Sequence, residues 1–468
     1  MMTKTFSLLL FLSLSITILG QDTLRYNDYI THVLLHHPLA KQANLLDNQT
    51  AAYILKAKGQ LDPVITSGLN RKYFKSQNYY TESLTEIKFK TASPISASVG
   101  YEHNSGGFLN TDLTLPDDGL LFASVHVPLL NGFLFDETRY ALKEANLIEL
   151  KNNIDKAILI NDLVYNATIS YIHWLKLHRE LDIYEENLEL SIKNHLAIVD
   201  LFVGGDYPAM DTIESNANIN TNQTTVLINK IKTLKVKQMV QYYLWDEDLN
   251  PLELADDVYP EDIFNGINSY QETSLLDIML LESPILQKYE LELSLLELDQ
   301  RLLKERGKPV LDLSFYTLAN LGENRFLDNQ SFKDYKLGLN FSYPIFNRKN
   351  NGDKELNDIQ QKEVLLERNL KTTELEIKFT AFMNQGNLQI EQLNLLDVNI
   401  AELTKLYQLE IDKFTLGEGS VFMINKRQEA LIKQKIIYNE TLFSLENIVE
   451  NMRYLLFDSE KFTEILDN

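Results

Sequence analysis

Two long stretches of the chain show apolar residues that recur with a helical period. In the first, apolar positions advance from residue 181 to residue 202 in six steps, which is the 3.5-residue period of a coiled-coil seam. These positions are Leu181, Tyr184, Leu188, Ile192, Leu196, Val199 and Phe202. The second stretch repeats the spacing at Leu393, Leu396, Ile400, Leu403, Tyr407, Ile411 and Phe414. Both stretches therefore predict long helices with one apolar seam.

Each predicted long helix ends where glycines interrupt the pattern. Residues 133–203 contain neither Gly nor Pro, which permits one continuous helix of about 100 Å. The helix is broken near residues 204–208, where Gly204 and Gly205 stand, and its counterpart is broken near residues 416–420. Further helical sequence follows each break. The pattern predicts two antiparallel helical hairpins, each with a sharp tip.

Shorter stretches alternate between apolar and polar residues, as β-strands with two different faces do. The clearest places Leu337, Leu339 and Phe341 on one face, with Tyr335 and Tyr343 at its ends. Weaker alternation occurs at Ile87 and Phe89; at Ile95, Ala97, Val99 and Tyr101; at Leu121, Ala123, Val125 and Val127; and at Leu311, Leu313 and Phe315. A lipid-facing barrel strand and a half-buried soluble strand share this period, so alternation alone leaves both interpretations open.

The order of these features is duplicated along the chain. Pro38 and Pro63 lie 25 residues apart, and so do Pro284 and Pro309. We predict a signal peptide at 1–20, a first repeat at 21–245 with strands at about 63–130, an irregular exposed linker at 246–271, and a second repeat at 272–468 with strands at about 309–346. The first repeat holds about 30 additional residues in its strand region, which form either an added hairpin or an elaborated outer loop.

The amino end is typical of an exported protein. Lys4 precedes an apolar run from Phe6 to Leu19, which ends at Gly20 before a polar segment. No later apolar stretch reaches the roughly 18 residues of a transmembrane helix, so any membrane crossing is expected to use β-strands.

Composition excludes several classes of function. The chain has no Cys and a formal net charge of −22, which argues against thiol chemistry and against nucleic-acid binding. That charge indicates a solvated acidic surface or, less directly, a cation-selective lumen. There is no phosphate-binding glycine loop, HExxH motif or nucleophile elbow. We therefore expect neither an enzyme nor a cofactor.

In order and spacing, the chain resembles the TolC-like outer-membrane efflux protein family from Leu24 to Phe457. The residues that carry the resemblance are His37-Pro38-Leu39, Gly59 to Pro63, Val127 to Gly132, Phe202 to Asp211, and Phe414 to Phe422. The resemblance implies a mixed α and β membrane protein in which three chains share one transmembrane β-barrel and their coiled-coil helices form an α-helical barrel, a tunnel through the periplasm. It also implies a periplasmic adaptor, an inner-membrane transporter and outer-membrane lipid as partners.

The resemblance further implies roles for residues at the two tips. Its adaptor-facing candidates are Gly204, Gly205, Gly417, Gly419 and Ser420, although turn chemistry alone also explains them.

Family members often carry carboxylates just inside the second tip, but this chain has Met423 and Lys426 there. The matching positions of the first tip hold Asp211 and Glu214, which we take as pore-gate candidates. At the start of a helix they also favour the helix dipole.

Two other groups of side chains have residue types that suit a functional site. The aromatic residues Tyr101, Tyr335 and Tyr343 are candidates for a membrane-interface girdle, with ordinary sheet packing as the alternative. His32 and His36 share a helix face, but no third ligand is evident and we predict no metal site.

The preferred hypothesis is a passive channel in the cell outer membrane, with most of the chain in the periplasm. A periplasmic coiled-coil adaptor without a pore is the first alternative, and it predicts one hairpin with a compact β-domain. A secreted enzyme is the second.

Overall fold

The computed structural model describes residues 23–205, 208–263, 274–320 and 333–457. The predicted signal peptide lies outside these residues. The chain divides into two compact units, and each takes segments from both predicted repeats. One unit comprises 1–42, 159–281 and 375–468, and the other comprises 43–158 and 282–374. We call them the hairpin unit and the sheet unit. The division into two repeats stays a prediction.

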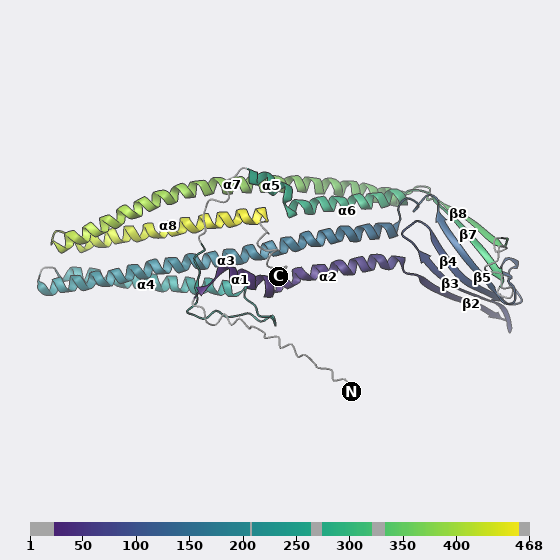
Figure 1. The fold of residues 1–468 in the computed structure, drawn as a ribbon, viewed down its shortest axis with the longest axis horizontal. Helices are drawn as coiled ribbons and strands as arrows, with labels where there is room; N and C mark the ends of the chain where they lie inside the picture. The colour runs from purple at the N-terminus through teal and green to yellow at the C-terminus, as the bar shows by residue number, and fades with distance from the viewer. Residues whose placement is uncertain (1–22, 206–207, 264–273, 321–332, 458–468) are drawn as a thin grey trace, which may run out of the picture. The chain divides into compact units, whose positions relative to one another are not determined.

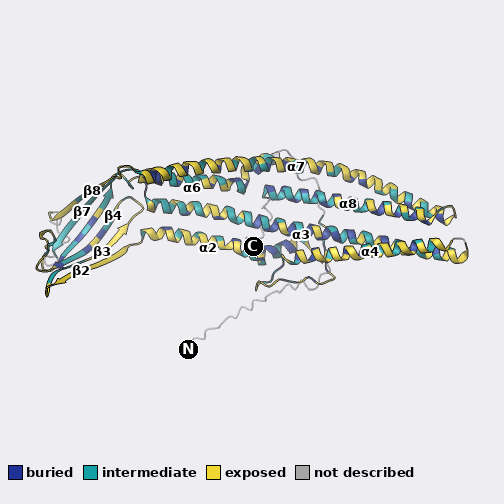
Figure 2. Ribbon diagram, turned by 180° about the vertical axis from the view of Figure 1, so that it is seen from behind, coloured by how far each residue is buried: buried dark blue, intermediate teal, exposed yellow. Residues whose placement is uncertain are grey.

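Both long helices are continuous, as the sequence predicts. Helices α3 (Glu137–Gly204) and α7 (Arg348–Thr415) have 68 residues each, which corresponds to about 100 Å. In the hairpin unit, α3 returns as α4 (Ala209–Gln241) and α7 returns as α8 (Val421–Leu456). Figures 1 and 2 show both hairpin tips at the same end of this unit.

Two of the four described shorter helices, α2 (Pro38–Lys58) and α6 (Pro284–Arg306), start at the duplicated prolines. Helices α1 (Tyr26–His36) and α2 precede the first strands, and α5 (Ser274–Glu282) and α6 precede the later ones. Proline suits the first turn because that turn needs no backbone N–H donor. In the sheet unit, Phe135 packs with Leu298 and Leu302 of α6, which joins the start of α3 to the later helices.

The second predicted seam is buried and the first is only partly so. On α7, Leu393, Leu396 and Phe414 are buried. On α3, however, Ile192 and Leu196 are 43% and 60% exposed. The residues of α3 that face the neighbouring helices are instead Asn187, Ser191, Asn194 and Ile198, of which Ile198 belongs to an apolar cluster with Tyr407, Phe414, Val421, Ile424 and Leu431. The predicted apolar positions of α3 are thus only partly buried within a single chain.

A six-stranded antiparallel sheet forms the core of the sheet unit, in the order β2-β3-β4-β5-β7-β8. Its strands are β2 (Val64–Phe74), β3 (Gln77–Lys90), β4 (Ser96–Ser105), β5 (Leu120–Pro128), β7 (Val310–Asn320) and β8 (Tyr335–Ser342). The additional residues of the first repeat thus supply strands, as the added-hairpin alternative requires. Strand β2 was missed, because Ser67, Gly68 and Arg71 interrupt its apolar alternation.

The first part of the linker is mostly exposed but is anchored at a few buried positions. Strand β6 (Tyr259–Pro260) pairs in parallel with β1 (Thr23–Leu24), and Leu254 and Val258 are buried. The buried Lys237 ammonium donates to the carbonyls of Ala255, Asp256 and Val258 at 2.5, 3.1 and 3.2 Å. Most residues of 246–263 are exposed and irregular, as predicted, but Leu254, Val258 and Pro260 are buried; 264–271 lies outside the described residues.

Candidate functional sites

The sheet has one apolar and one polar face across all six strands. Its strands pair so that odd-numbered residues oppose odd-numbered residues up to the bulge after Lys72. The odd-numbered face carries the large apolar residues Ile65, Leu69, Ile87, Phe89, Val99, Leu121, Val125, Val127, Leu311, Leu313, Phe315, Leu337, Leu339 and Phe341. On β8, Leu337, Leu339 and Phe341 are each more than 60% exposed.

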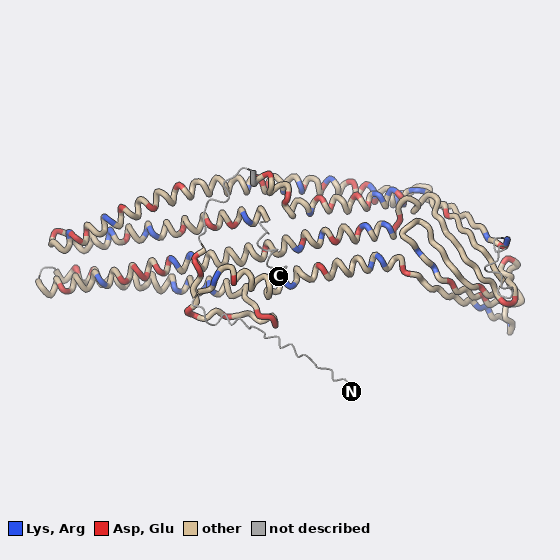
Figure 3. The backbone as a smooth tube through the Cα atoms, viewed as in Figure 1, with Lys and Arg blue, Asp and Glu red and all other residues tan. Residues whose placement is uncertain are grey.

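Charged residues of the sheet gather on the opposite face. Figure 3 shows the strands largely free of charge, and β5 contains no Lys, Arg, Asp or Glu. Those on the even-numbered face are Lys72, Glu82, Glu86, Lys88, Lys90, Glu102, Asp312 and Lys336. Arg71 is the one charged strand residue on the apolar face among the described residues, and it lies four residues before the β2–β3 turn. Such segregation is typical of a sheet with lipid on one side and water on the other.

Two of the three candidate interface aromatics, Tyr335 and Tyr343, lie at the two ends of β8. Tyr335 begins β8, stacks on Phe315 with ring centroids 5.9 Å apart and is 58% exposed. Tyr343 follows β8 at its other end and is 47% exposed. Tyr101 lies near the middle of β4, and its hydroxyl donates a hydrogen bond to the Asp118 carbonyl at 2.9 Å. Their interface role stays a prediction.

Turn geometry accounts for part of the tip sequence. Gly205 and Gly417 have φ values of +85° and +78°, which glycine adopts without the Cβ strain of other residues. A Cβ on Gly419 would lie 2.8 Å from backbone atoms of Phe414. Ser420 caps α8 by accepting the Met423 N–H on its hydroxyl at 3.3 Å. Gly204 is the last residue of α3, and part of that tip, residues 206–207, lies outside the described residues.

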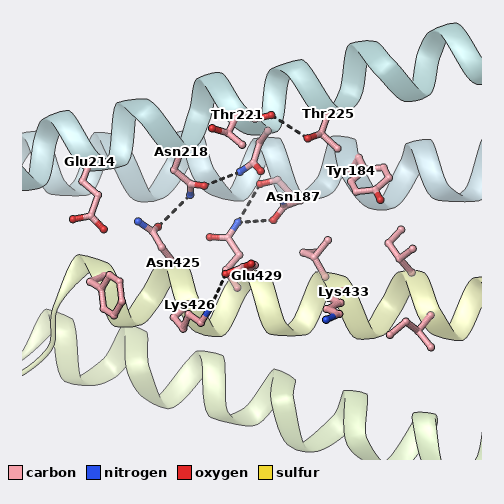
Figure 4. A pocket seen from close by; sticks show the side chains of 16 residues that line it. Tyr184, Asn187, Glu214, Asn218, Thr221, Thr225, Asn425, Lys426, Glu429 and Lys433 are labelled. Carbon is pink, nitrogen blue, oxygen red and sulfur yellow. Dashed lines mark hydrogen bonds and ion pairs between the residues drawn. The ribbon is translucent and has the colours of Figure 1, made fainter.

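Above the tips, a polar network joins α3, α4 and α8. Its members, which we call the amide ladder, are Asn187, Ser191, Asn194, Asn218, Asn222, Asn425 and Gln428. Figure 4 shows three of them, Asn187, Asn218 and Asn425, between the two hairpins. These side chains are polar, so the periodicity of apolar residues does not predict that they lie at a contact between helices.

Gln428 is the centre of the amide ladder. Its buried amide donates to the Asn187 Oδ1 at 2.7 Å and to the Ser191 Oγ at 3.0 Å. Its carbonyl accepts from the Asn194 amide at 3.3 Å, and Asn194 also donates to the Tyr407 hydroxyl on α7 at 3.0 Å. Burial raises the pKa of Tyr407, which keeps the phenol neutral. One glutamine thereby links both hairpins through uncharged hydrogen bonds.

A second connection lies nearer the tips. The Asn218 amide donates to the Asn425 Oδ1 at 3.1 Å, and the Asn222 amide donates to the Ser191 Oγ at 2.7 Å. His195 and Ser215 form a further hydrogen bond of 2.7 Å between α3 and α4. The Asn218–Asn425 bond is a second link between the hairpins, whereas the other two bonds join α3 to α4 within the first hairpin.

A cavity of about 560 Å³ lies beside the amide ladder. Its lining includes the gate candidates Glu214 and Lys426, on opposite hairpins, together with Phe422. Lys426 is paired with Glu429 at 3.0 Å, and both are largely exposed, so this ion pair contributes little to stability. Asp211 and Met423 are not among the lining residues. Two of the four gate candidates are thus brought to one cavity.

The described residues contain no group of three or more His, Cys, Asp or Glu arranged to hold a metal ion. The imidazole rings of His32 and His36 lie 4.6 Å apart, but the His32 Nε2 is hydrogen-bonded to the Trp245 carbonyl at 2.7 Å. None of the described helices is both long and apolar enough to cross a membrane.

Solved structures of outer-membrane channels share this arrangement of hairpins and sheet. The Campylobacter jejuni CmeC outer membrane channel matches with a TM-score of 0.66 at 11% identity, over 94% of this chain and 88% of that chain. The Vibrio cholerae outer membrane protein VceC matches with a TM-score of 0.64 at 11% identity, over 92% of this chain and 95% of that chain. The open state of the Neisseria gonorrhoeae MtrE outer membrane channel matches with a TM-score of 0.62 at 11% identity, over 92% of this chain and 88% of that chain.

The chain has the fold of TolC-like outer-membrane channels. No protein-family profile and no curated protein sequence matches it. At 11% identity the likeness is one of fold, and the predicted fold class is confirmed at that level.

Proposed function

We propose that this chain is one subunit of a channel that gives substrates a passive exit across the outer membrane. Three copies share one β-barrel in the membrane, and their helices enclose a tunnel in the periplasm. Energy comes from an inner-membrane transporter, which a periplasmic adaptor connects to the channel in a tripartite efflux pump or a type I secretion system.

The observation that carries this proposal is the two-faced sheet. Its apolar face holds one charged residue among its described strand positions, whereas the polar face holds eight. Tyr335 and Tyr343 are eight residues apart, which is about 22 Å along the membrane normal for a strand tilted by about 35°. That spacing is close to the roughly 25 Å apolar band between the aromatic girdles of outer-membrane barrels.

Unpartnered apolar surface on the helices supports assembly of several copies. Besides Ile192 and Leu196 of α3, α7 exposes Leu366, Leu370, Ile377, Leu388, Leu395 and Val398. These positions recur at spacings of three, four, seven and eleven residues, as seam residues of a coiled coil do. Packing against a neighbouring copy covers both stripes.

The tips are the proposed meeting point with the adaptor. Five large apolar side chains near them are more than 60% exposed, namely Val203, Met210, Ile213, Leu416 and Phe422. The sharp turns at Gly205 and Gly417 place this apolar surface at the end of each hairpin. Separation of the hairpins at the amide ladder then opens the passage, with Glu214 and Lys426 beside it.

The test is the single-channel conductance of the purified mature protein in a planar bilayer, together with its oligomeric mass in detergent. We expect stable conductance from a trimer. A water-soluble monomer that never inserts overturns the channel and favours the coiled-coil adaptor. That adaptor predicts one hairpin and a compact β-domain, whereas two hairpins and an open sheet with an exposed apolar face are observed.

Gate residues are tested in the same bilayers. Asp211→Ala and Glu214→Ala are expected to change the conductance or the open probability, because three copies of each carboxylate face the passage. Glu418→Ala is the matched control for Glu214→Ala, since Glu418 is an exposed tip carboxylate that, unlike Glu214, lies outside the cavity lining. Equal effects of all three substitutions contradict a specific gate at Asp211 and Glu214.

A further inference from the structure

A second cavity, of about 490 Å³, lies on the polar face of the sheet and is lined by residues of β2, β3 and β4. Leu113 also lines it and belongs to loop 106–119, which joins β4 to β5 at the end of the sheet away from the helices (Figure 1). We call it the loop cavity. It lies within the sheet unit of a single chain, so its geometry does not depend on how copies assemble.

The charged groups of the loop cavity do not balance. Its lining carries the carboxylates of Glu82, Glu86 and Glu102 and one ammonium group, that of Lys88, a net formal charge of −2. Lys88 is paired with Glu86 at 2.8 Å, and the Thr66 hydroxyl donates to Glu86 at 3.3 Å. Glu82 and Glu102 are half-buried and have no ion-pair partner among the described residues. One divalent cation would neutralise both.

Strand register brings these two carboxylates to one place. Glu82 lies directly opposite Asn104 in the β3–β4 pairing, and Glu102 lies two residues before Asn104 on the same face of β4. Asn70 of β2 lies opposite Glu82 on its other side. Side chains directly opposite have Cβ atoms about 5 Å apart, and diagonal neighbours lie about 7–8 Å apart. Both carboxylates can therefore reach a single ion.

The Asn104 side chain has more oxygen neighbours than it can satisfy. It lines the loop cavity, is only 7% exposed, and its amide nitrogen donates to the Glu102 Oε1 at 2.9 Å and to the Leu113 carbonyl at 3.1 Å. Its own Oδ1 is buried and accepts no hydrogen bond. A buried amide oxygen without a partner is costly. Rotation of the amide by 180° turns that oxygen to the point where the Glu102 and Leu113 oxygens already converge, and a cation at this point satisfies all three.

We propose that the loop cavity binds a divalent cation of the calcium class through the carboxylates of Glu82 and Glu102, the Asn104 amide oxygen and the Leu113 carbonyl. Calcium accepts six to eight oxygen ligands and combines carboxylates with amide and main-chain carbonyls and water, whereas magnesium requires near-octahedral geometry and keeps most of its water. The lining contains neither His nor Cys, which zinc and copper prefer. Only two of the ligands are carboxylates, so the site differs from a cluster of three acidic side chains.

Such an ion fastens the middle of loop 106–119 to the sheet. Near its ends the loop is held by other bonds, because the Phe108 N–H donates to the Tyr79 carbonyl at 3.0 Å and the Tyr101 hydroxyl donates to the Asp118 carbonyl at 2.9 Å. Leu113 lies between these two anchors. A cation shared by Leu113, Glu82 and Glu102 therefore joins the loop to β3 and β4 and holds it against the polar face.

The first test is calorimetric titration of the purified mature protein with CaCl₂ after treatment with EDTA, in about 0.15 M KCl to screen diffuse attraction. We expect saturable binding, and weaker binding of MgCl₂. Glu82→Gln and Glu102→Gln should each weaken calcium binding by about tenfold or more, because each removes a charged ligand. Asp312→Asn is the matched control, since Asp312 is a half-buried carboxylate on the same face but outside the cavity lining. Equal weakening by all three substitutions overturns the site and indicates diffuse attraction to an acidic chain.

Asn104 variants test the role of the amide oxygen. Asn104→Asp should bind calcium more tightly than the wild type, and Asn104→Leu should bind it at least about tenfold more weakly, because charge and number of oxygen ligands set the affinity. Without calcium, Asn104→Asp should unfold at a lower temperature than the wild type, since it places a carboxylate beside the Glu102 and Leu113 oxygens. Weaker calcium binding by both variants overturns ligation by the Asn104 oxygen.

The wild-type protein provides a test that requires no variant to fold. Amide hydrogen exchange at residues 106–119 should slow in CaCl₂ relative to EDTA, and equal exchange in both overturns the fastening of the loop. Failure of this site is distinguishable from failure of the proposed function. A conducting trimer without calcium binding overturns the site alone, whereas a calcium-binding monomer that never inserts into a bilayer supports the site and overturns the channel.

Discussion

At the scale of single residues, Gln428 is the side chain that links α8 to α3 by three hydrogen-bond partners. It donates to Asn187 and Ser191 and accepts from Asn194, so it satisfies polar groups on α3 that are otherwise shut away from water. A buried amide with unmet hydrogen bonds costs more than the net gain of making them. The polar contact therefore specifies which faces of the hairpins meet.

Replacement of this glutamine by an apolar residue of similar size tests that role. Gln428→Leu should lower the free energy of unfolding by about 1–3 kcal/mol, because Asn187 and Asn194 lose buried partners. Thermal and denaturant unfolding followed by helical circular dichroism measures the change. Gln408→Leu is the matched control, since Gln408 is exposed and bonds only to Asp412 within α7. Equal stability of both variants would argue against a structural role for the amide ladder.

The carboxyl of Glu446 makes stability depend on pH. Burial raises its pKa above the ordinary 4.5, and nearby Glu450 and Asp262 add to the rise while Arg453 opposes it. The folded chain therefore holds this proton to a higher pH than the unfolded chain. Its contribution to stability is complete below pH 4.5 and is lost as pH rises through the folded pKa.

We expect the difference in unfolding temperature between wild type and Glu446→Gln to shift with pH. The variant should gain on the wild type as pH rises from about 4.5 to 7.5, because glutamine carries no charge that burial penalises. Melting curves over this range measure the difference. Parallel curves for the two proteins would contradict a raised pKa of Glu446.

At the scale of elements, the two glycines of the second tip have different constraints. Gly417 has a positive φ but open space around a Cβ, whereas a Cβ on Gly419 meets the Phe414 backbone. Gly417→Ala should therefore cost about 1–2 kcal/mol of backbone strain with the tip otherwise unchanged. Gly419→Ala should displace the turn, which faster hydrogen exchange at residues 414–421 would report. Identical exchange in both variants would contradict this distinction.

Elements with a strong internal period are those that the sequence predicted. The two long helices, both tips and five of the six strands follow from spacing alone, because each buries or exposes one continuous face. Strand β2 does not, since its identity as a strand comes from pairing with β3 rather than from its own alternation. The packing of Leu254 and Val258 was likewise unpredictable, because it depends on Lys237, distant from the segment that it anchors.

The sequence predicted the residues near the tip glycines but not the amide ladder. Glu214 and Lys426 were found by their position relative to the tip glycines, and the structure brings both to one cavity. The amide ladder has the same seam spacing as an apolar stripe, with Asn187, Ser191 and Asn194 four and three residues apart. A search that admits Asn, Ser and Gln at seam positions finds it.

At the scale of the whole molecule, the formal charge of −22 on each copy should favour cations in the lumen. Reversal potentials across a salt gradient should show a preference for K⁺ over Cl⁻ at about 0.1 M salt. The preference should weaken near 1 M, where the Debye length falls from about 10 Å to about 3 Å. Anion preference at low salt would place the acidic residues away from the permeation path.

The pairing of β1 with β6 sets an order in which the molecule can fold. Thr23 and Leu24 lie beside Tyr259 and Pro260, and the Tyr171 hydroxyl donates to the Leu24 carbonyl at 2.6 Å. The first described residues therefore have no strand partner until more than half of the chain has been delivered to the same compartment. Closing a loop of this length is slow relative to helix growth. The amino end is thus locked late, after the first hairpin already exists, and a chain that stalls before residue 260 keeps that end accessible to proteases.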